Sequence, residues 1–406
     1  MDVTNVTKDT VQTLLDDGKT SDIVKEVLKL RQQLAKSSVA KYKKMVTTLG
    51  EGERIRGLTQ FYGANATGRW AGRLVQIQNL PRNYIKTLDL ARKAVLSKNV
   101  DFLKMCYESV PDTLSQLIRT AFIPSENNKL VIADFSAIEA RVIAWLAGES
   151  WVNEVFATHG KIYEATASNM FHVPIDLIKK GNSEYELRQK GKVATLALGY
   201  QGGEGALIAM NALKMGIKED ELKDIVARWR AANPHIVRLW RTVGNALLKV
   251  MSTAEPQTIN KGIRFEYIGD NTFGQRFLTV QLPSSRKLYY ARPRIVEGGS
   301  RFGNDAVFYM SLNQTTKKYE LTGTYGGKMT ENIVQAIARD CLAETLSRLN
   351  TEGLNYIFHV HDEVVIDAPL DLSVDYVCEL MSKPICWADG LLLRAAGFES
   401  EYYMKD

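Results

Sequence analysis

Short apolar runs that end in carboxylates mark two widely separated parts of the chain. One run ends at Asp134, and another leads into a turn that contains Asp362 before a further apolar run follows. The runs are short and rich in β-branched or aromatic residues, which predicts buried strands rather than helices. A carboxylate at the end of a buried strand needs a partner, because an unpaired buried charge is costly. The runs cover residues 130–133, 356–360 and 364–366.

Helical and strand-like spacing divides the rest of the chain. Apolar residues recur at helical spacing in most of the other segments, whereas residues 283–325 alternate like strands broken by glycines and residues 391–398 are expected to be extended. The pattern therefore predicts a mixed α/β fold with a β-rich insertion, and its length of 406 residues predicts two or three subdomains. Residues 151–282 are expected to be mostly helical, and helices are predicted within residues 11–30, 138–146, 219–231, 236–251, 329–349 and 378–382.

The two carboxylates suggest a metal site. If their strands lie side by side, Asp134 and Asp362 are offered to a pair of Mg²⁺ ions, an arrangement that serves in-line phosphoryl transfer. For either residue alone, an ordinary turn that happens to contain an aspartate is the better explanation.

A basic helix is predicted between the two acidic strands. Arg188, Lys192, Leu196 and Tyr200 recur at every fourth residue, so they share one face of a helix. The two cations suit a polyphosphate, and Leu196 and Tyr200 suit the sugar and base of the same molecule. A solvated basic helix whose apolar residues face a core is the alternative reading of this segment alone.

With this helix between the two acids, the chain resembles the family A DNA polymerases, the bacterial DNA polymerase I type and its phage relatives. Five segments match the motifs of that family in the same order, from about residue 25 to the C-terminus, and five motifs together are far more specific than any one of them. They are 67–69 with 78–81 (primer-template segment), 134–141 (motif A), 188–200 (motif B), 331–335 (a palm helix facing the template and the new base pair) and 361–363 (motif C).

The resemblance implies a right-hand polymerase fold with palm, fingers and partial thumb subdomains. It also implies that the proofreading exonuclease domain of the family is missing ahead of the thumb, so we expect no exonuclease activity. A fragment, a natural short enzyme and one half of a split enzyme remain open. The implied boundaries are 1–58 for a partial thumb, 59–150 for the first part of the palm, 151–325 for the fingers with the β-rich insertion, and 326–406 for the second part of the palm.

The resemblance also assigns roles to residues of the site. Asp134, Asp362 and the backbone carbonyl of Phe135 are expected to hold two Mg²⁺ ions, for which Mn²⁺ is expected to substitute. Lys192 is expected to protonate the leaving pyrophosphate, and Glu363 to lie near the site without being a full ligand. Residues expected to bind the nucleotide are Arg188, Lys192, Leu196, Tyr200, Glu139 and Tyr163. Residues expected to position primer and template are Arg69, Gln78, Asn79, Asn332, Gln335 and His361.

Four positions depart from the family pattern. Leu196 stands where the family has Phe or Tyr, Gln201 replaces a Gly, Tyr163 stands where bacterial members have a His, and Ala137 replaces a polar residue. These departures leave the expected metal ligands, phosphate-binding cations and Glu139 in place. The resemblance therefore implies an active enzyme with altered selectivity.

Charge and composition agree with a nucleic-acid partner without requiring one. Lys and Arg number 52 against 46 Asp and Glu, which gives a net charge of +6. Arginines at 286, 292 and 294 flank Tyr289 and Tyr290, a pattern that suits phosphates and stacked bases, although a solvated surface strand explains it equally well. Cys106, Cys341, Cys378 and Cys386 form no zinc or redox motif and are expected to be reduced thiols.

We therefore expect a template-directed DNA polymerase that adds deoxynucleotides to a primer 3′-hydroxyl, serving phage DNA replication. Expected partners are primer-template DNA, deoxynucleoside triphosphates, and an exonuclease or processivity subunit in trans. No apolar stretch is long enough to span a bilayer, so we expect a cytoplasmic protein, in a bacterial host cell if a phage encodes it. The alternatives are a non-catalytic DNA-clamping subunit and a relative that uses ribonucleotides or copies RNA; Glu139 favours deoxynucleotides.

Overall fold

A four-stranded antiparallel sheet brings the two acid-bearing strands together. The computed structural model describes residues 6–34, 39–269, 274–313 and 316–405. The order of the strands is β10-β11-β3-β12, and Glu363 at the start of β11 lies opposite Asp134 near the end of β3. The predicted adjacency of the two strands is confirmed. The strands are β3 (Asn128–Phe135), β10 (Tyr356–Val360), β11 (Glu363–Pro369) and β12 (Ala395–Ser400).

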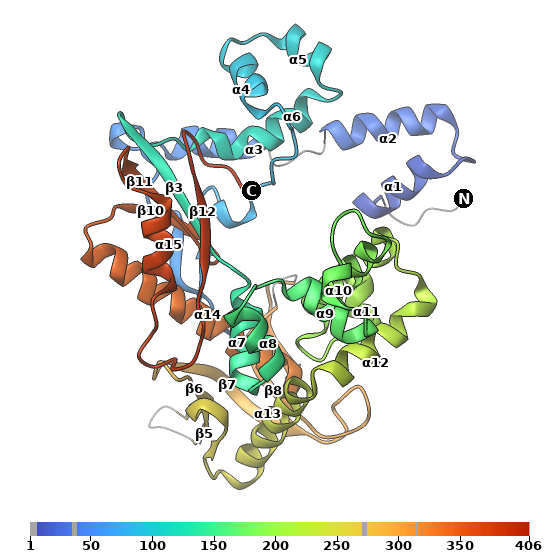
Figure 1. Cartoon of the computed structure of the whole chain (residues 1–406), viewed down its shortest axis with the longest axis vertical. Helices are drawn as coiled ribbons and strands as arrows, with labels where there is room; N and C mark the ends of the chain where they lie inside the picture. The colour runs from blue at the N-terminus through green and yellow to red at the C-terminus, as the bar shows by residue number, and fades with distance from the viewer. Residues whose placement is uncertain (1–5, 35–38, 270–273, 314–315, 406) are drawn as a thin grey trace.

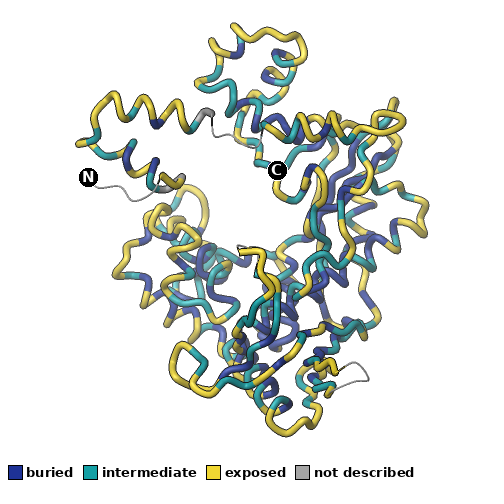
Figure 2. The backbone as a smooth tube through the Cα atoms, turned by 180° about the vertical axis from the view of Figure 1, so that it is seen from behind, coloured by how far each residue is buried: buried dark blue, intermediate teal, exposed yellow. Residues whose placement is uncertain are grey.

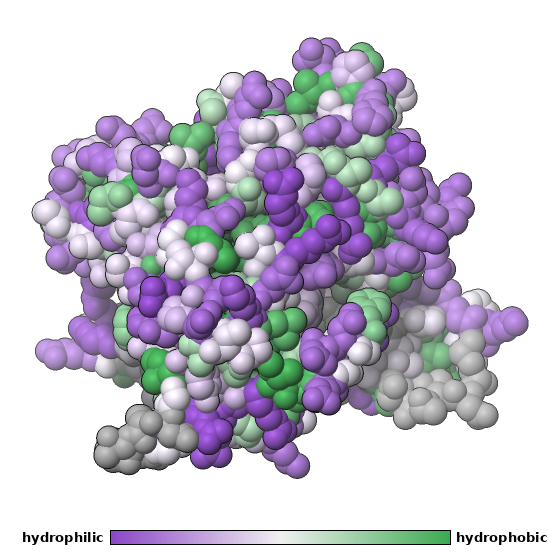
Figure 3. Space-filling view, turned by 90° about the horizontal axis from the view of Figure 1, so that it is seen from below, coloured by the Kyte–Doolittle hydropathy of each residue, from purple (hydrophilic) through white to green (hydrophobic). Residues whose placement is uncertain are grey.

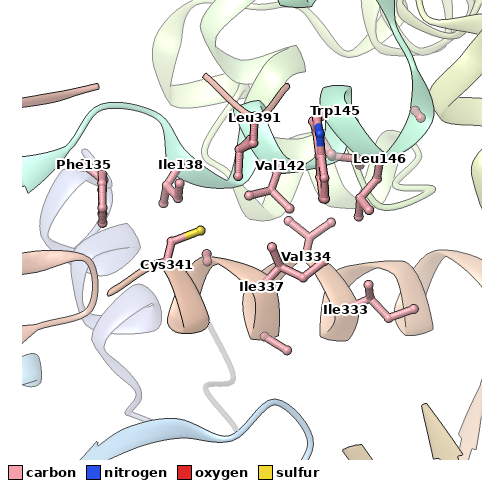
Figure 4. Close-up of a cluster of buried hydrophobic side chains, with 14 of the residues drawn as sticks. Phe135, Ile138, Val142, Trp145, Leu146, Ile333, Val334, Ile337, Cys341 and Leu391 are labelled. Carbon is pink, nitrogen blue, oxygen red and sulfur yellow. The ribbon is translucent and has the colours of Figure 1, made fainter. Parts of the chain in front are cut away.

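Both faces of this sheet are covered. On one face, Val131 and Ile366 belong to a large core that includes the apolar sides of three helices, and Figure 4 shows side chains of α7 and α14 meeting in it. On the other face, Leu130 and Val365 pack in a second core with Tyr403 from the end of the chain. Polar groups of the sheet can therefore meet a ligand only at the ends of its strands. The three helices are α7 (Ile138–Ala147), α14 (Gly326–Thr351) and α15 (Val374–Ser382).

A group of helices stands across from the sheet (Figure 1). Within it, α10 crosses α9 so closely that a Cβ atom at Gly191 would lie 2.3 Å from the carbonyl oxygen of Tyr163, which only glycine avoids. The helices predicted within residues 219–251 are confirmed here. The group contains α8 (Ser150–Ala157), α9 (Ile162–Phe171), α10 (Glu186–Leu198), α11 (Glu204–Ala209), α12 (Leu222–Ala232) and α13 (Pro234–Thr253).

The β-rich part is a six-stranded antiparallel sheet whose strands follow sequence order. It begins at Gln257, so the expectation of mainly helical structure up to residue 282 was wrong beyond Thr253. The missed strands are five residues long or shorter, and such short runs give a weak periodic signal. The strands are β4 (Gln257–Thr258), β5 (Arg264–Ile268), β6 (Phe277–Gln281), β7 (Lys287–Val296), β8 (Ala306–Leu312) and β9 (Tyr319–Thr324).

Two helical groups lie on the outside of the molecule (Figure 1). The N-terminal helices are largely exposed (Figure 2), and a second group, made of three short helices, lies within the range assigned to the first part of the palm. That range also holds a hairpin of β1 (Thr59–Ala64) and β2 (Arg69–Gly72). The subdomain boundaries stay predictions. The outer helices are α1 (Lys8–Asp16), α2 (Asp22–Leu34), α3 (Ala40–Thr48), α4 (Leu88–Leu96), α5 (Val100–Cys106) and α6 (Val110–Leu117).

The surface gives no indication of a membrane span. Within the described ranges, no helix combines the length and the apolar composition needed to cross a bilayer. The view from below shows small hydrophobic patches separated by hydrophilic ones (Figure 3).

Candidate active site

Two carboxylates meet where β3 ends and the turn between β10 and β11 begins. His361 adopts a left-handed conformation with φ of 57°, which lets a tight turn present Asp362, and the amide of Phe135 donates to the carbonyl of Asp362 at 3.3 Å. Oδ1 of Asp134 is buried and has no hydrogen-bond partner. A buried oxygen without a partner fits a cation ligand, because the ion would supply the missing interaction. Among the described residues there is no group of three or more His, Cys, Asp or Glu arranged to hold a metal.

Burial and mutual repulsion perturb these acids. Burial, followed by the nearby charge of Asp362, raises the pKa of Asp134 to about 7 against the opposing effect of Lys405. Burial also raises the pKa of Asp362, while Arg69 opposes that shift. The ionised form of each carboxyl group is therefore destabilised in the metal-free protein, and a bound cation would stabilise it.

Lys405 approaches the carboxylates from the end of the chain. Its Nζ lies 3.9 Å from Oδ2 of Asp134 and 3.6 Å from Oε2 of Glu363. The other oxygen of Glu363 accepts a hydrogen bond from the hydroxyl of Tyr403 at 2.6 Å. Both carboxylate oxygens of Glu363 therefore contact protein groups, and its expected place near the site without being a full metal ligand stays a prediction.

A pocket of about 550 Å³ opens beside the acids. Its wall brings together segments that are far apart in sequence: the end of β3, the start of α7, the helices α9 and α10, and the turn before β11. This volume lies within the range of small-molecule sites. Eight of the predicted site residues line it, namely Arg69, Asp134, Glu139, Tyr163, Leu196, Tyr200, His361 and Asp362.

The last turn of α10 and the residues that follow it reach the pocket. Leu196 and Tyr200 line the pocket. Arg188 and Lys192 do not line it; Arg188 forms an ion pair with Glu164 at 2.6 Å, and the charged groups of both lie within 6.0 Å of the ring of Tyr163. The two cations therefore lie next to Tyr163, which lines the pocket, but they do not line it themselves.

Glu139 is fixed from two sides. It accepts a hydrogen bond from the hydroxyl of Tyr200 at 2.8 Å and forms an ion pair with Arg69 at 3.3 Å. Burial, followed by the charge of Glu139, raises the pKa of Tyr200 well above its ordinary value, so this hydroxyl remains a donor. The expected hydrogen bond between Glu139 and Tyr200 is confirmed.

The residues expected to position primer and template are only partly brought together. The side chain of Gln78 donates to the carbonyl of Trp70 at 3.3 Å, and that of Asn79 donates to Gln76 at 3.3 Å. Asn332 is buried and donates to the hydroxyl of Tyr290 at 3.3 Å. In this structure Asn332 therefore supports a neighbouring tyrosine and does not line the pocket, and Gln335 lies half-buried on the same helix.

The departures from the family pattern have visible local consequences. Gln201 adopts φ of 65°, a conformation that suits the replaced Gly, and its Oε1 accepts from the amide of Gly327 at 3.0 Å at the start of α14. Ala137 has φ of 53° immediately before α7. Gln201 thus offsets an unfavourable backbone conformation with a hydrogen bond to an otherwise free helix-end amide.

Sequence reasoning missed two cations of the pocket. Arg82 and Lys405 both line it. Lys405 follows the last strand, and the antiparallel pairing of β12 with β3 brings this end of the chain to the acids.

Comparisons with known proteins agree with this geometry. The sequence model described as DNA polymerase family A matches residues 2–258. A "DNA polymerase" of Bacillus phage SP02 is 51% identical over 405 residues, which cover 100% of this chain and 61% of that protein. "DNA polymerase I, thermostable" of Thermus aquaticus is 27% identical over 256 residues, 63% of this chain and 24% of that protein. The chain thus spans about three fifths of the phage relative.

Among solved structures, the fold matches one described as the POL domain of Pol1 from M. smegmatis in complex with DNA primer-template and dNTP. The TM-score is 0.62 at 19% identity, and the match covers 99% of this chain and 58% of that one. The mixed helix-and-sheet fold predicted from the sequence is confirmed. Since the family model covers more than half of the chain, the protein belongs to DNA polymerase family A.

Proposed function

We propose that this chain is a template-directed DNA polymerase that extends a primer 3′-hydroxyl with deoxynucleotides. The observation that carries this proposal is the meeting of Asp134 and Asp362 at one end of adjacent strands, with a buried oxygen of Asp134 left without a partner. The face of α10 stands in the wall of the same pocket, as a nucleotide site requires. The phage relative, named a DNA polymerase, supports a role in phage DNA replication.

Family A polymerases use divalent metal ions, and the donor set here fits Mg²⁺, a hard cation that takes oxygen ligands. Asp134, Asp362 and the backbone carbonyl of Phe135 would hold two such ions, and Mn²⁺ would substitute. When bound, the ions activate the primer hydroxyl and offset charge on the phosphates.

The protein's own groups then orient the nucleotide. Arg188 and Lys192 would bind the phosphates, which requires Arg188 to exchange its ion pair with Glu164 for the ligand. Lys192 is also the candidate donor of a proton to the leaving pyrophosphate. Leu196 would lie against the sugar and Tyr200 against the base, because both already line the pocket.

Glu139 supports a preference for deoxynucleotides. Its carboxylate is held by Tyr200 and Arg69, so a displacement that admits a 2′-hydroxyl would break a hydrogen bond and an ion pair. Primer and template would be positioned by Arg69 and His361 at the pocket, and by Gln78, Asn79, Asn332 and Gln335 around it. The proposed partners are primer-template DNA and deoxynucleoside triphosphates, with an exonuclease or processivity subunit acting in trans, in the cytoplasm of a bacterial host.

A primer-extension assay tests this proposal. A labelled primer on a DNA template should lengthen with deoxynucleotides and Mg²⁺, and should stay unchanged in EDTA or with ribonucleotides alone. A protein that binds the primer-template without extending it would be a clamping subunit. Extension with ribonucleotides at a comparable rate would establish the second alternative.

A further inference from the structure

Two adjoining hollows lie on the six-stranded sheet, away from the catalytic pocket. The first has a volume of about 270 Å³ and the second about 450 Å³, and Met310 lines both. Three arginines line the second hollow: Arg276, Arg292 and Arg294. Five tyrosines line the first: Tyr62, Tyr289, Tyr290, Tyr309 and Tyr319.

An irregularity in the sheet lies where the two hollows adjoin. Ala291 pairs with Met310, but the register between β7 and β8 shifts before Arg294, and Arg292 has φ of 48°. Such a bulge re-aims side chains of the bulged strand. Arg292 and Arg294 are both exposed, and neither guanidinium has an acidic partner in the part of the chain that the structure describes.

The tyrosines form a firm floor with exposed rings at its margin. Tyr290 is buried and donates its hydroxyl to the carbonyl of Ala66 at 3.2 Å, and Tyr309 packs against it with ring centroids 4.8 Å apart. Tyr289 and Tyr319 are 52% and 57% exposed, so much of their ring surface meets solvent. Exposed aromatic rings beside unneutralised arginines form the combination that binds single-stranded nucleic acid, through stacking and phosphate contacts.

A short connection joins the hollows to the catalytic pocket. Ala66, in the turn between β1 and β2, lines the tyrosine hollow, whereas Arg69 on β2 lines the catalytic pocket. Three residues span at most about 10 Å of extended chain. A strand that enters the catalytic pocket past Arg69 therefore has the tyrosine hollow within reach.

We propose that the two hollows bind the unpaired template strand, with a base against the tyrosines and its neighbouring phosphates on Arg292 and Arg294. This inference rests on the proposed polymerase function, because only a template-directed enzyme has an unpaired strand leading to its site. The positive charge of the second hollow favours a polyanion, and duplex DNA is the alternative occupant that the test must separate from a single strand.

Fluorescence anisotropy without nucleotides provides the test. Labelled primer-templates carry either a blunt end or a 5′ template overhang of roughly eight nucleotides, within the site size of single-strand binders. Wild-type protein should bind the overhang substrate more tightly. The double variant Tyr289→Leu with Arg294→Gln loses stacking and phosphate contacts together. Its affinity for the overhang substrate should fall about tenfold, whereas its affinity for the blunt duplex should stay unchanged.

Matched variants locate the effect. Arg264→Gln removes a charge from the same sheet outside both hollows and should leave overhang binding unchanged. Tyr289→Phe keeps the stacking surface and should bind like the wild type. The slope of log affinity against log salt should fall by about 0.7 when Arg294→Gln removes one single-strand phosphate contact.

Crosslinking of the wild-type protein gives a readout that does not depend on variants. With 5-iododeoxyuridine in the overhang, crosslinked peptides should come from residues 287–296 or 306–319. Crosslinks only elsewhere, or equal losses on blunt and overhang substrates in the double variant, would overturn the proposal. Primer extension by the wild-type protein is measured separately. Normal extension without tighter binding of the overhang substrate would refute template binding at the hollows and leave the polymerase function intact. Tighter binding of the overhang substrate without extension would refute the polymerase function and leave the binding site intact.

Discussion

In the four-stranded sheet, β3 and β11 are buried along almost their whole length, whereas β7 in the six-stranded sheet alternates between buried and exposed residues. The first sheet is covered on both faces, so its polar groups reach a ligand only where strands end, and there Asp134 and Asp362 meet. The second has an open face, so side chains along the strand, such as Tyr289 and Arg294, face solvent. A sheet that is covered on both faces can present functional groups only at one end of its strands. A sheet with one open face can present a binding surface along several strands.

The largest effect should come from the acids at the strand ends. Asp134→Ala and Asp362→Ala should each reduce primer extension by at least about a thousandfold, because the loss of a metal ligand removes several kcal/mol of transition-state stabilisation. Binding of primer-template should change little. Steady-state extension and anisotropy measure the two quantities. The control is Asp371→Ala, an exposed acid just after β11. Extension at a tenth of the wild-type rate in either variant would contradict the two-metal site.

The next effect compares the two sheets directly through stability. Ile366→Ala in the fully buried β11 should lower the free energy of unfolding by about 2–5 kcal/mol, since it leaves a cavity. Leu312→Ala at the exposed end of β8 should change it by no more than about 0.5 kcal/mol. Urea denaturation followed by circular dichroism measures both. Similar losses in the two variants would mean that the six-stranded sheet is covered on its open face.

Glu139 tests whether the pocket beside the strand ends selects the sugar. Glu139→Ala should raise ribonucleotide incorporation relative to deoxynucleotide by about tenfold to a hundredfold, or roughly 1–3 kcal/mol, because it empties the 2′ space. It also removes the partner of Tyr200. Competitive single-nucleotide incorporation measures the ratio. Glu139→Gln, which keeps the bulk, serves as the control, and unchanged selectivity in the Ala variant would place the sugar elsewhere.

Leu196 tests a second residue that lines the pocket. The wild type should reject dideoxynucleotides, since Leu196 offers neither a planar surface nor a hydroxyl to replace the missing 3′-hydroxyl. Leu196→Tyr should raise their use by a factor corresponding to about 1–3 kcal/mol. The measurement is competition between dideoxy- and deoxynucleotide on one template. Gln189→Tyr puts the same ring on α10 near Met215, outside the pocket, and should have no effect. Equal discrimination in Leu196→Tyr and wild type would show that Leu196 does not face the sugar.

The smallest effect concerns pH and the metal-free protein. The folded-state pKa of Asp134, about 7, lies above the unfolded value of about 3.9, so the folded state retains a proton that the unfolded state releases. Stability is therefore lost as pH rises from about 4 to about 7. In EDTA, Asp134→Asn should reduce that loss by about 1 kcal/mol, a modest value because solvent screens the partly exposed carboxylate. Thermal melts at low and neutral pH measure it, with Asp371→Asn as control. An identical pH profile in Asp134→Asn would show that the acid is not destabilised by burial.

The sequence alone determined the strands that carry the acids, the face of α10 and the long helices, because each depends on local periodicity. Asp134 and Asp362 could be assigned to strand ends from apolar runs of a few residues, and Leu196 and Tyr200 to one face from their spacing. The short strands β5 and β6 were not predicted, because runs of five residues give little periodic signal.

The tertiary structure alone decided which distant groups meet. Lys405 reaches Asp134 through the pairing of β12 with β3, and Asn332 donates a hydrogen bond to Tyr290 although the family resemblance assigned it to primer and template. The same holds for the tyrosine and arginine hollows, which need both the pairing of β7 with β8 and the approach of the β1–β2 hairpin. Periodicity is a property of neighbours along the chain, whereas the burial, ion pairs and pKa of a site depend on neighbours in space, and these exist only once the sheets have paired.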